Sequence, residues 1–218
     1  MPKLSKTSKL DGILSWSLQA IETCSGSVGD DGALVDACAT CYATQGMYVM
    51  GPVKAPRAFN KEDWKNEEWV AEMVAAITKG RKPKLYFRWF DSGDMYSVSL
   101  AWKMYEVMVL TPEIQHWLPT RMAKFEKFHE VLEAMQNLAN VRVRFSSDSI
   151  EGDYTPGLHG STIIQEGQST DAFVCGAPDN GGMCSGCRAC YSKDIPVIAY
   201  RAHGNKNKRV IMMKRAAL

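Results

Sequence analysis

Seven cysteines, gathered into two groups, constrain this 218-residue chain more than any other feature of its sequence. The first group lies near the N-terminus and comprises Cys24, Cys38 and Cys41. The second lies near the C-terminus and comprises Cys175, Cys184, Cys187 and Cys190. Thiolates two residues apart can converge on one metal centre, because a tight turn brings their sulfurs close together. The grouping of three and four therefore predicts two separate metal centres.

Disulfide bonds and free thiols are the alternatives to metal binding. A disulfide framework needs a secreted chain and an even number of cysteines, whereas the number here is odd. The N-terminal segment MPKLSKTSKLDGILSW has no apolar run long enough for a signal peptide, and no other run is long enough to span a membrane. We therefore expect a cytoplasmic protein with no membrane partner, in a compartment where disulfides do not persist.

Strand and helix patterns alternate along the chain. Helices are expected at 60–80, where Asn60 would be the N-cap, and at 97–110 and 122–138. Strands are expected at 13–18, 84–90, 114–118, 141–145, 161–164, 195–200 and 209–213. Strict alternation of this kind implies a parallel sheet with right-handed crossovers. We expect an α/β fold in which about six parallel strands form an incomplete (β/α) barrel.

Composition and charge narrow the domain organisation and the partners. No linker, charge block or repeat divides the sequence, so we expect one domain spanning 1–218, with the second cysteine region at about 171–194. A hydrophobic content of 45% and a charged content of 23% are ordinary for a soluble globular protein. The net charge of +2 gives no argument for a nucleic-acid partner beyond the basic ends of the chain.

Polar loops follow three of the expected strands and suggest a site for a small molecule. The loop residues singled out are Ser92, Gly93, Asp94, Arg121, Ser146, Ser147 and Asp148. The carboxyl ends of parallel strands meet at one edge, so these loops should converge with the first cysteine group, which follows the strand at 13–18. Serine and aspartate are also common helix N-caps, but their repetition behind successive strands favours a site.

The two cysteine groups imply different chemistry. Three cysteines around a cubane iron–sulfur cluster leave one iron open to bind a small molecule or pass it an electron. Four cysteines leave no open position, which suits a structural zinc or an electron-relay cluster. We therefore expect a [4Fe-4S] cluster at the first group and a second iron–sulfur cluster or zinc at the second. A ligand set drawn from both groups is a further alternative.

Several segments carry a resemblance to a known family. They are CSGSVGDDGALVDACATCYAT, YFRWFDSGDMYS, HWLPTRMAKF, VRFSSDSI, HGST and CRACYSKDIPVIAYRAHG. Together they resemble the phage-encoded gene-product-eighty-eight family over nearly the whole chain, which implies location in the host cytoplasm but no activity. That family's architecture is similar in turn to the radical SAM superfamily. The second resemblance implies that Ser92, Gly93 and Asp94 contact the amine of S-adenosylmethionine and that residues 146–149 contact its ribose.

The match to the superfamily departs from the usual pattern at the cysteine loop. The superfamily places three and then two residues between its cysteines, whereas thirteen and then two separate them here. Thr40 stands where an aromatic residue usually precedes the last cysteine, and Tyr42 follows it instead. Loop length costs little free energy, so the insertion is compatible with a cluster.

Three hypotheses for function follow. The first is a radical SAM-type redox enzyme with an electron donor, in which the cofactor yields a radical that abstracts hydrogen from a small-molecule substrate. Asp94, Arg121 and Asp148 would line its pocket, whereas His159 and His203 are placed outside the site. The second is a non-catalytic phage protein, stabilised by zinc or a cluster, that binds a host or phage partner. The third is a nucleic-acid-modifying protein.

Overall fold

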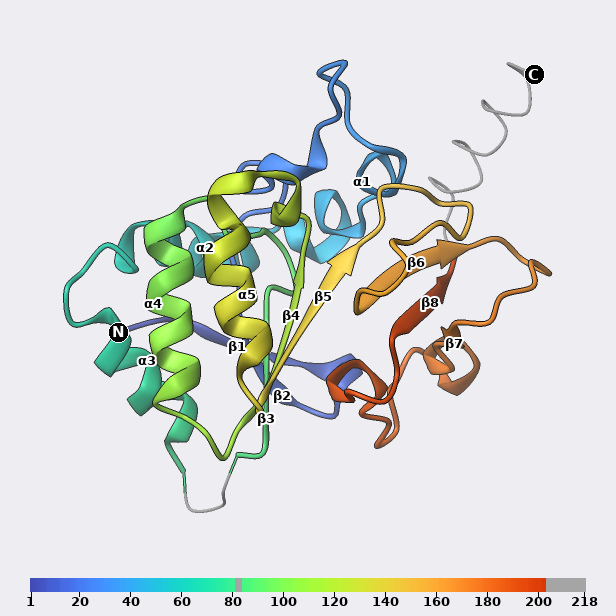
Figure 1. Ribbon diagram of the computed structural model, residues 1–218. Coiled ribbons are helices and arrows are strands. Elements are labelled where there is room, and N and C mark those ends of the chain that lie inside the picture. The colour runs from blue at the N-terminus through green and yellow to red at the C-terminus, as the bar shows by residue number, and fades with distance from the viewer. Residues whose placement is uncertain (81–83, 203–218) are drawn as a thin grey trace.

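The computed structural model describes residues 1–80 and 84–202, and within them eight strands form one sheet (Figure 1). The strands are β1 (Leu4–Thr7), β2 (Ile13–Trp16), β3 (Tyr86–Trp89), β4 (Gln115–Thr120), β5 (Val141–Ser146), β6 (Gly160–Ile164), β7 (Phe173–Val174) and β8 (Val197–Arg201). Their order is β1-β2-β3-β4-β5-β6-β8-β7. The pairing of β1 with β2 is antiparallel, and the remaining pairs are parallel.

The expected parallel α/β architecture is confirmed, but barrel closure is not seen among the described strands. β1 and β7 are the two edges of an open sheet. Both edge strands escaped the sequence analysis, because β1 (LSKT) is largely polar and β7 has two residues. The strand expected at 209–213 lies outside the described residues. No helix in the described ranges is long and apolar enough to cross a membrane.

The described residues contain α1 (Asp36–Ala39), α2 (Gly51–Asp63), α3 (Trp69–Thr78), α4 (Val98–Val109) and α5 (His129–Asn137). The last three cover one face of the sheet, whereas α1 and α2 contact the loops at the carboxyl ends of the strands. Short 3-10 turns lie at Ser8–Leu10, Ser25–Ser27, Tyr42–Thr44, Gly46–Val49, Met122–Lys124, Glu126–Phe128, Ala177–Asn180 and Ala189–Tyr191. In Figure 1, α3, α4 and α5 lie side by side over β2 to β5. They are the crossover segments that parallel neighbouring strands require.

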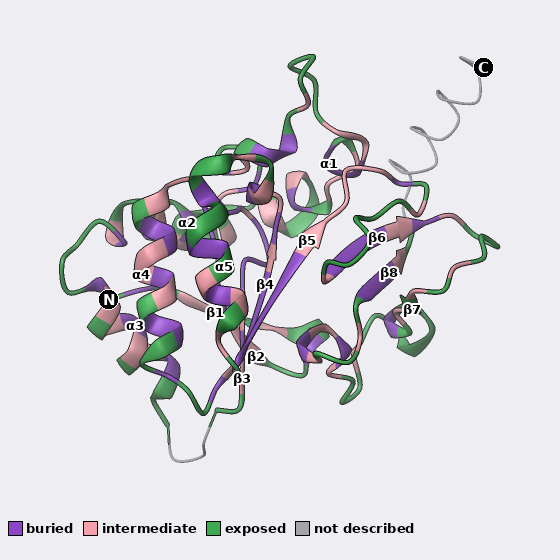
Figure 2. Ribbon diagram, viewed as in Figure 1, coloured by how far each residue is buried: buried purple, intermediate pink, exposed green. Residues whose placement is uncertain are grey.

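Alternation along the strands separates the apolar core from a polar face. Phe87 and Trp89 on β3 face the helices. On the same face, the rings of Trp16 and Trp69 of α3 pack edge to face, with their centres 5.4 Å apart. Burying each such side chain contributes about 1.5–3 kcal/mol to folding. The intervening residues of β3 to β5 point to the opposite face, which we call the cysteine-side face; Arg88, Trp117, Arg142 and Arg144 lie on it. β5 is buried on both faces over most of its length (Figure 2).

Two of the expected helices differ from those observed. The helix expected at 60–80 is divided, because Asn66 forms a turn by accepting a hydrogen bond from the Glu68 amide at 3.1 Å. Asn60 is therefore not an N-cap but lies inside α2, where its side chain bonds the carbonyl of Ser17 at 3.0 Å. The helix expected at 122–138 begins only at His129, because two 3-10 turns occupy the preceding residues.

Candidate functional site

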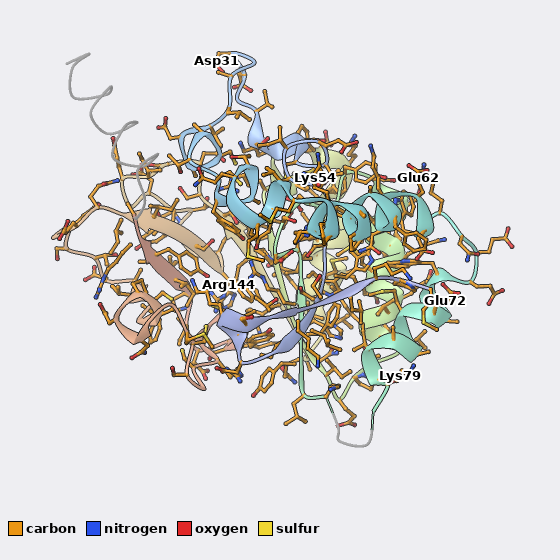
Figure 3. All side chains as sticks on the ribbon, turned by 180° about the vertical axis from the view of Figure 1, so that it is seen from behind. Asp31, Lys54, Glu62, Glu72, Lys79 and Arg144 are labelled. Atoms are coloured by element: carbon orange, nitrogen blue, oxygen red, sulfur yellow. The ribbon has the colours of Figure 1, made fainter. Side chains whose placement is uncertain are left out.

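The first cysteine group lies in the loop that leaves the carboxyl end of β2. The thirteen residues between Cys24 and Cys38 form a hairpin, closed by the bridge between Val28 and Leu34 and by a 2.9 Å bond from the Val35 amide to the Ser27 carbonyl. Its tip, at Asp31, projects from the molecule (Figure 3). The long insertion is therefore an excursion that begins and ends at the same place.

The three thiols of the first group are close enough to influence one another. Burial raises the pKa of the Cys24 thiol to about 12, and the nearby Asp94, Cys38 and Cys41 contribute to the increase. Cys38 lies within α1 and Cys41 directly follows it. The fold thus brings together thiols that the sequence separates by thirteen residues.

Cationic side chains lie beside Cys38. Arg121 and Lys124, from the loop after β4, both pair with the carboxylate of Asp148, Arg121 at 3.3 Å. The carbonyl of Asp148 accepts the amide of Ala37 in α1 at 2.9 Å. Burial raises the pKa of the Cys38 thiol, while the charges of Arg121 and Lys124 oppose the increase. The loops after β4 and β5 therefore meet the first cysteine group, as the sequence predicts.

Asp94 ties the loop after β3 to the loop after β4. One carboxylate oxygen accepts the hydroxyl of Thr120 at 2.9 Å and the amide of Met95 at 2.8 Å, and the other accepts the amide of Arg121 at 2.9 Å. Burial raises the pKa of Asp94 to about 6, and the three hydrogen bonds act in the opposite direction. The carboxylate is thus buried and bonded to protein donors.

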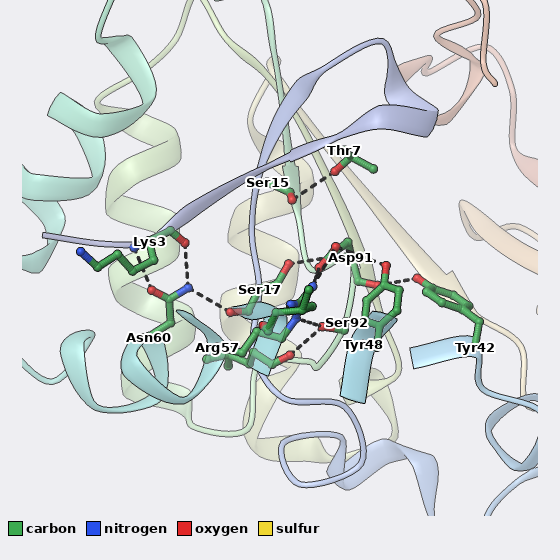
Figure 4. A network of polar contacts seen from close by, with 12 residues as sticks. Lys3, Thr7, Ser15, Ser17, Tyr42, Tyr48, Arg57, Asn60, Asp91 and Ser92 are labelled. Atoms are coloured by element: carbon green, nitrogen blue, oxygen red, sulfur yellow. Dashed lines mark hydrogen bonds and ion pairs between the residues drawn. The ribbon is translucent and has the colours of Figure 1, made fainter. Parts of the chain in front are cut away.

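A buried ion pair anchors α2 to the end of β3 (Figure 4). Arg57 donates to both carboxylate oxygens of Asp91 at 3.1 Å and to the hydroxyl of Ser92 at 2.6 Å. Ser92 in turn donates to the carbonyl of Leu18 at 2.8 Å. The hydroxyl of Ser92 therefore connects β3, α2 and the segment after β2.

Two tyrosines connect the chain after Cys41 to Asp91. The Tyr42 hydroxyl donates to the carbonyl of Asp91, and the Tyr48 hydroxyl donates to its carboxylate at 3.4 Å. The guanidinium of Arg57 lies 5.0 Å from the centre of the Tyr48 ring. These contacts fix the path of the chain that follows Cys41, the last cysteine of the first group.

Gly93 is expected to be intolerant of a side chain. Its φ is +79°, and a Cβ added there would lie 2.7 Å from Leu18 Cβ and 2.8 Å from the Leu18 carbonyl. Gly93→Ala should lower the free energy of unfolding by about 2–5 kcal/mol, combining about 1–2 for the left-handed conformation with about 1–3 for overpacking. Gly32 is a matched control, because its φ is also +79° and a Cβ there would meet nothing within 4 Å. Denaturant unfolding of both variants measures the difference, and equal losses would contradict it.

The second cysteine group joins two distant parts of the sheet. The amide of Cys184 donates to the carbonyl of Lys9 in the β1–β2 connection, and the amide of Cys175 donates to the carbonyl of Ala199 in β8, both at 2.8 Å. Burial raises the pKa values of the Cys184 and Cys190 thiols, and Cys175 contributes to both increases. The four cysteines thus gather over the cysteine-side face.

Arg144 holds the backbone of the segment that carries the last cysteine of the second group. Its guanidinium, fully buried on β5, donates to five carbonyl oxygens, those of Cys190, Gly160, Pro196, Ala189 and Ser192. The distances range from 2.9 to 3.4 Å. A buried arginine satisfied in this way is a structural element that holds residues 189–192 against the sheet.

The thiols are free, and the described residues contain no preformed site for a metal ion. All seven cysteines lie in the described ranges, and none forms a disulfide. Among these residues, no group of three or more His, Cys, Asp or Glu side chains could hold a metal ion as placed.

A known family matches most of the chain. The family described as Gene product 88 matches residues 2–174. The chain belongs to this family. The match contains the first cysteine group and ends immediately before Cys175, so the second group lies beyond it. No curated protein and no solved structure matches the chain. The gene-product family expected from the sequence is confirmed, whereas the superfamily resemblance stays a prediction.

Two groups of residues in this Gene product 88 family member could not be predicted from the sequence. The first is the ion pair of Arg57 with Asp91, of which only the position of Asp91 after an expected strand pointed to the site. The second is Arg88 on β3 and Arg144 on β5, because hydrophobic patterning assigns no role to polar residues on the cysteine-side face. Of the expected residues, Ser147 contributes its carbonyl, which accepts from Arg121 at 2.8 Å, and Ser146 ends β5.

Proposed function

We propose that this protein is an iron–sulfur protein. Cys24, Cys38 and Cys41 would hold a [4Fe-4S] cluster with one iron open to S-adenosylmethionine or another small ligand. The four C-terminal cysteines would hold a second metal centre. The proposal is supported mainly by one observation, the gathering of three thiols at the carboxyl ends of the parallel strands, where α/β folds bind ligands.

The donor set suits a thiolate-ligated centre. A buried thiol with a pKa of about 12, as at Cys24, is protonated at neutral pH, but metal coordination removes that proton. Arg121 and Lys124 supply positive charge beside Cys38 that would partly offset the negative charge of bound thiolates. When bound, an open-iron cluster would supply one-electron chemistry to a ligand on that iron.

The neighbouring polar residues would position the site. The Ser92 hydroxyl is engaged by Arg57 and Leu18, so we assign it a role in holding the loop after β3 in shape. Asp94 holds the loop after β4 in the same way, through Thr120 and the Arg121 amide. Arg121 and Asp148 both act electrostatically on the Cys38 thiol and are the side chains we assign to the ligand pocket.

A non-catalytic protein that binds a host or phage partner is the second candidate. Apolar side chains are exposed just after the first cysteine group, with Met47 at 69%, Val49 at 52% and Met50 at 56% exposure. Exposed apolar residues that gather in one segment are typical of an interaction surface. In this case the metal centres would stabilise the fold without catalysing a reaction.

Electron paramagnetic resonance of the reduced protein tests the small-ligand part of the proposal. Adding S-adenosylmethionine should change the spectrum of the first cluster, because the ligand would bind directly to iron. Cys38→Ala should abolish that signal, and Asp94→Ala should weaken the response by loosening the loops. Asp153→Ala, at an exposed position, is the control and should leave the response intact. An unchanged spectrum, with no binding by calorimetry, would exclude this cofactor.

A further inference from the structure

Four buried donors on the cysteine-side face lack acceptors among the described residues. Three of them are the Nε of Arg88, the Nε1 of Trp117 and the hydroxyl of Tyr191, and the fourth is the Nε of Arg142. The guanidinium of Arg88 lies 4.6 Å from the centre of the Trp117 ring, and the Trp117 and Tyr191 rings are 5.8 Å apart. Leaving a buried donor unpaired costs about 1–3 kcal/mol. Three unpaired donors on neighbouring side chains indicate a common acceptor that is not part of the polypeptide.

These donors border the second cysteine group. Cys184 and Cys190 pack against the cluster formed by Leu10, Trp117 and Tyr191. Tyr191 is adjacent to Cys190 in sequence, and Arg88 lies close enough to Cys190 for its charge to act on that thiol. The Cys190 sulfur is also 3.4 Å from the hydroxyl of Tyr200. The missing acceptor therefore belongs beside cysteine sulfurs.

The two metals expected at this group differ in the acceptors they offer. Zinc with four thiolates is a closed tetrahedron in which the cysteine sulfurs are the available acceptors. An iron–sulfur cluster adds inorganic sulfides at its surface, and hydrogen bonds to its sulfurs help to set its reduction potential. Donors without a protein acceptor thus favour the cluster.

Arg88 also contacts or acts on residues next to both cysteine groups. Tyr42, which follows Cys41, bonds its guanidinium, and Tyr200 and Cys190 are near enough for electrostatic interaction with it. Burial opposes the charge of Arg88, but Tyr42, Asp91 and Tyr200 raise its pKa, so it stays a cation. A fixed cation favours a reduced cluster, because reduction adds negative charge.

We infer that the second cysteine group holds an iron–sulfur cluster whose sulfurs accept hydrogen bonds from Arg88, Trp117 and Tyr191. Arg88 is the positioning residue that raises the reduction potential of this cluster. The inference rests on the proposed function, from which it takes metal binding by these four cysteines. It adds the kind of centre and the side chains that tune it.

The test is a redox titration of the second cluster in a Cys38→Ala background, which lacks the first cluster. Arg88→Met should lower the ratio of reduced to oxidised cluster at a fixed potential about tenfold, equivalent to a shift of about 59 mV for one electron. Arg88→Lys should retain most of the potential. Arg142→Met is the matched control, because Arg142 also has an unpaired buried Nε on this face, but the charges acting on it come from Arg144 and Asp194 and not from a cysteine.

Further variants keep the test decisive if Arg88→Met fails to fold. Trp117→Phe and Tyr191→Phe preserve ring packing while removing one donor each, and each should lower the potential and shift the iron–sulfur stretching bands in resonance Raman spectra. Zinc without sulfide at the second group would overturn the inference and leave its metal site standing. A cluster whose potential and Raman bands are unchanged in all the donor variants would overturn the assigned donors. An unmodified protein that contains no metal at either cysteine group would overturn the proposed function itself.

Discussion

Arg57→Met is expected to lower the free energy of unfolding by about 3–5 kcal/mol, the range for removing one partner of a buried ion pair. The side chains of Arg57 and Asp91 are 6% and 9% exposed, so the carboxylate would stay buried after losing the cation that is bonded directly to it. The variant also removes the contact that holds α2 to Ser92 at the end of β3. Denaturant unfolding measures the loss.

A surface pair on the same helix is the control for Arg57. Lys61 pairs with Glu22, whose side chain is 52% exposed, so Lys61→Ala should cost at most about 1 kcal/mol. The double variant Arg57→Met with Asp91→Asn should be more stable than Arg57→Met alone, because no unpaired buried charge remains. Similar losses for Arg57→Met and Lys61→Ala would show that the buried pair does not hold the helix.

Cys184→Ala is expected to destabilise the protein far more than Cys38→Ala. A structural metal contributes about 10–16 kcal/mol in zinc-finger peptides, so losing a ligand of the second centre should lower the melting temperature by at least about 10 °C. The second loop also joins the β1–β2 connection to β8, through Lys9 and Ala199. Cys38→Ala should loosen only the loop that follows β2, beyond the end of the sheet, and should lower the melting temperature by only a few degrees.

Thermal unfolding of the two cysteine variants, purified without oxygen, measures this difference. Cys187→Ala and Cys190→Ala should behave like Cys184→Ala, and Cys41→Ala should behave like Cys38→Ala. Equal decreases in melting temperature for the two groups would contradict the assignment of a structural role to the second group alone. A chelator that removes metal from the unmodified protein should reproduce the effect of the Cys184 variant.

Local patterns predicted the central part of the fold. The segments from β3 to β5 were predictable because their strands are apolar and α4 has strong periodicity. α2 was missed because Pro56 lies inside it, and proline ordinarily disfavours a helix interior. Its position is set instead by Arg57 and Asp91, thirty-four residues apart, whose pairing no local pattern reveals.

The candidate site was predictable in position and less so in contacts. Parallel strands place their following loops at one edge, which is why Asp94, Arg121 and Asp148 were found from sequence. That the Asp94 carboxylate bonds Thr120 depends on the strand register and could not be read from spacing. Nor did the spacing of Cys24 and Cys38 reveal that the thirteen residues between them form a hairpin, which brings the two cysteines together.

We propose above all that the seven cysteines hold iron and sulfide. Protein purified without oxygen should be brown, with iron and acid-labile sulfide in equal amounts and with broad visible absorption from thiolate-ligated iron. Cys38→Ala and Cys184→Ala should each lower the iron and sulfide content, since they act on different centres. A colourless preparation with stoichiometric zinc and no sulfide, or with no metal at all, would contradict the claim.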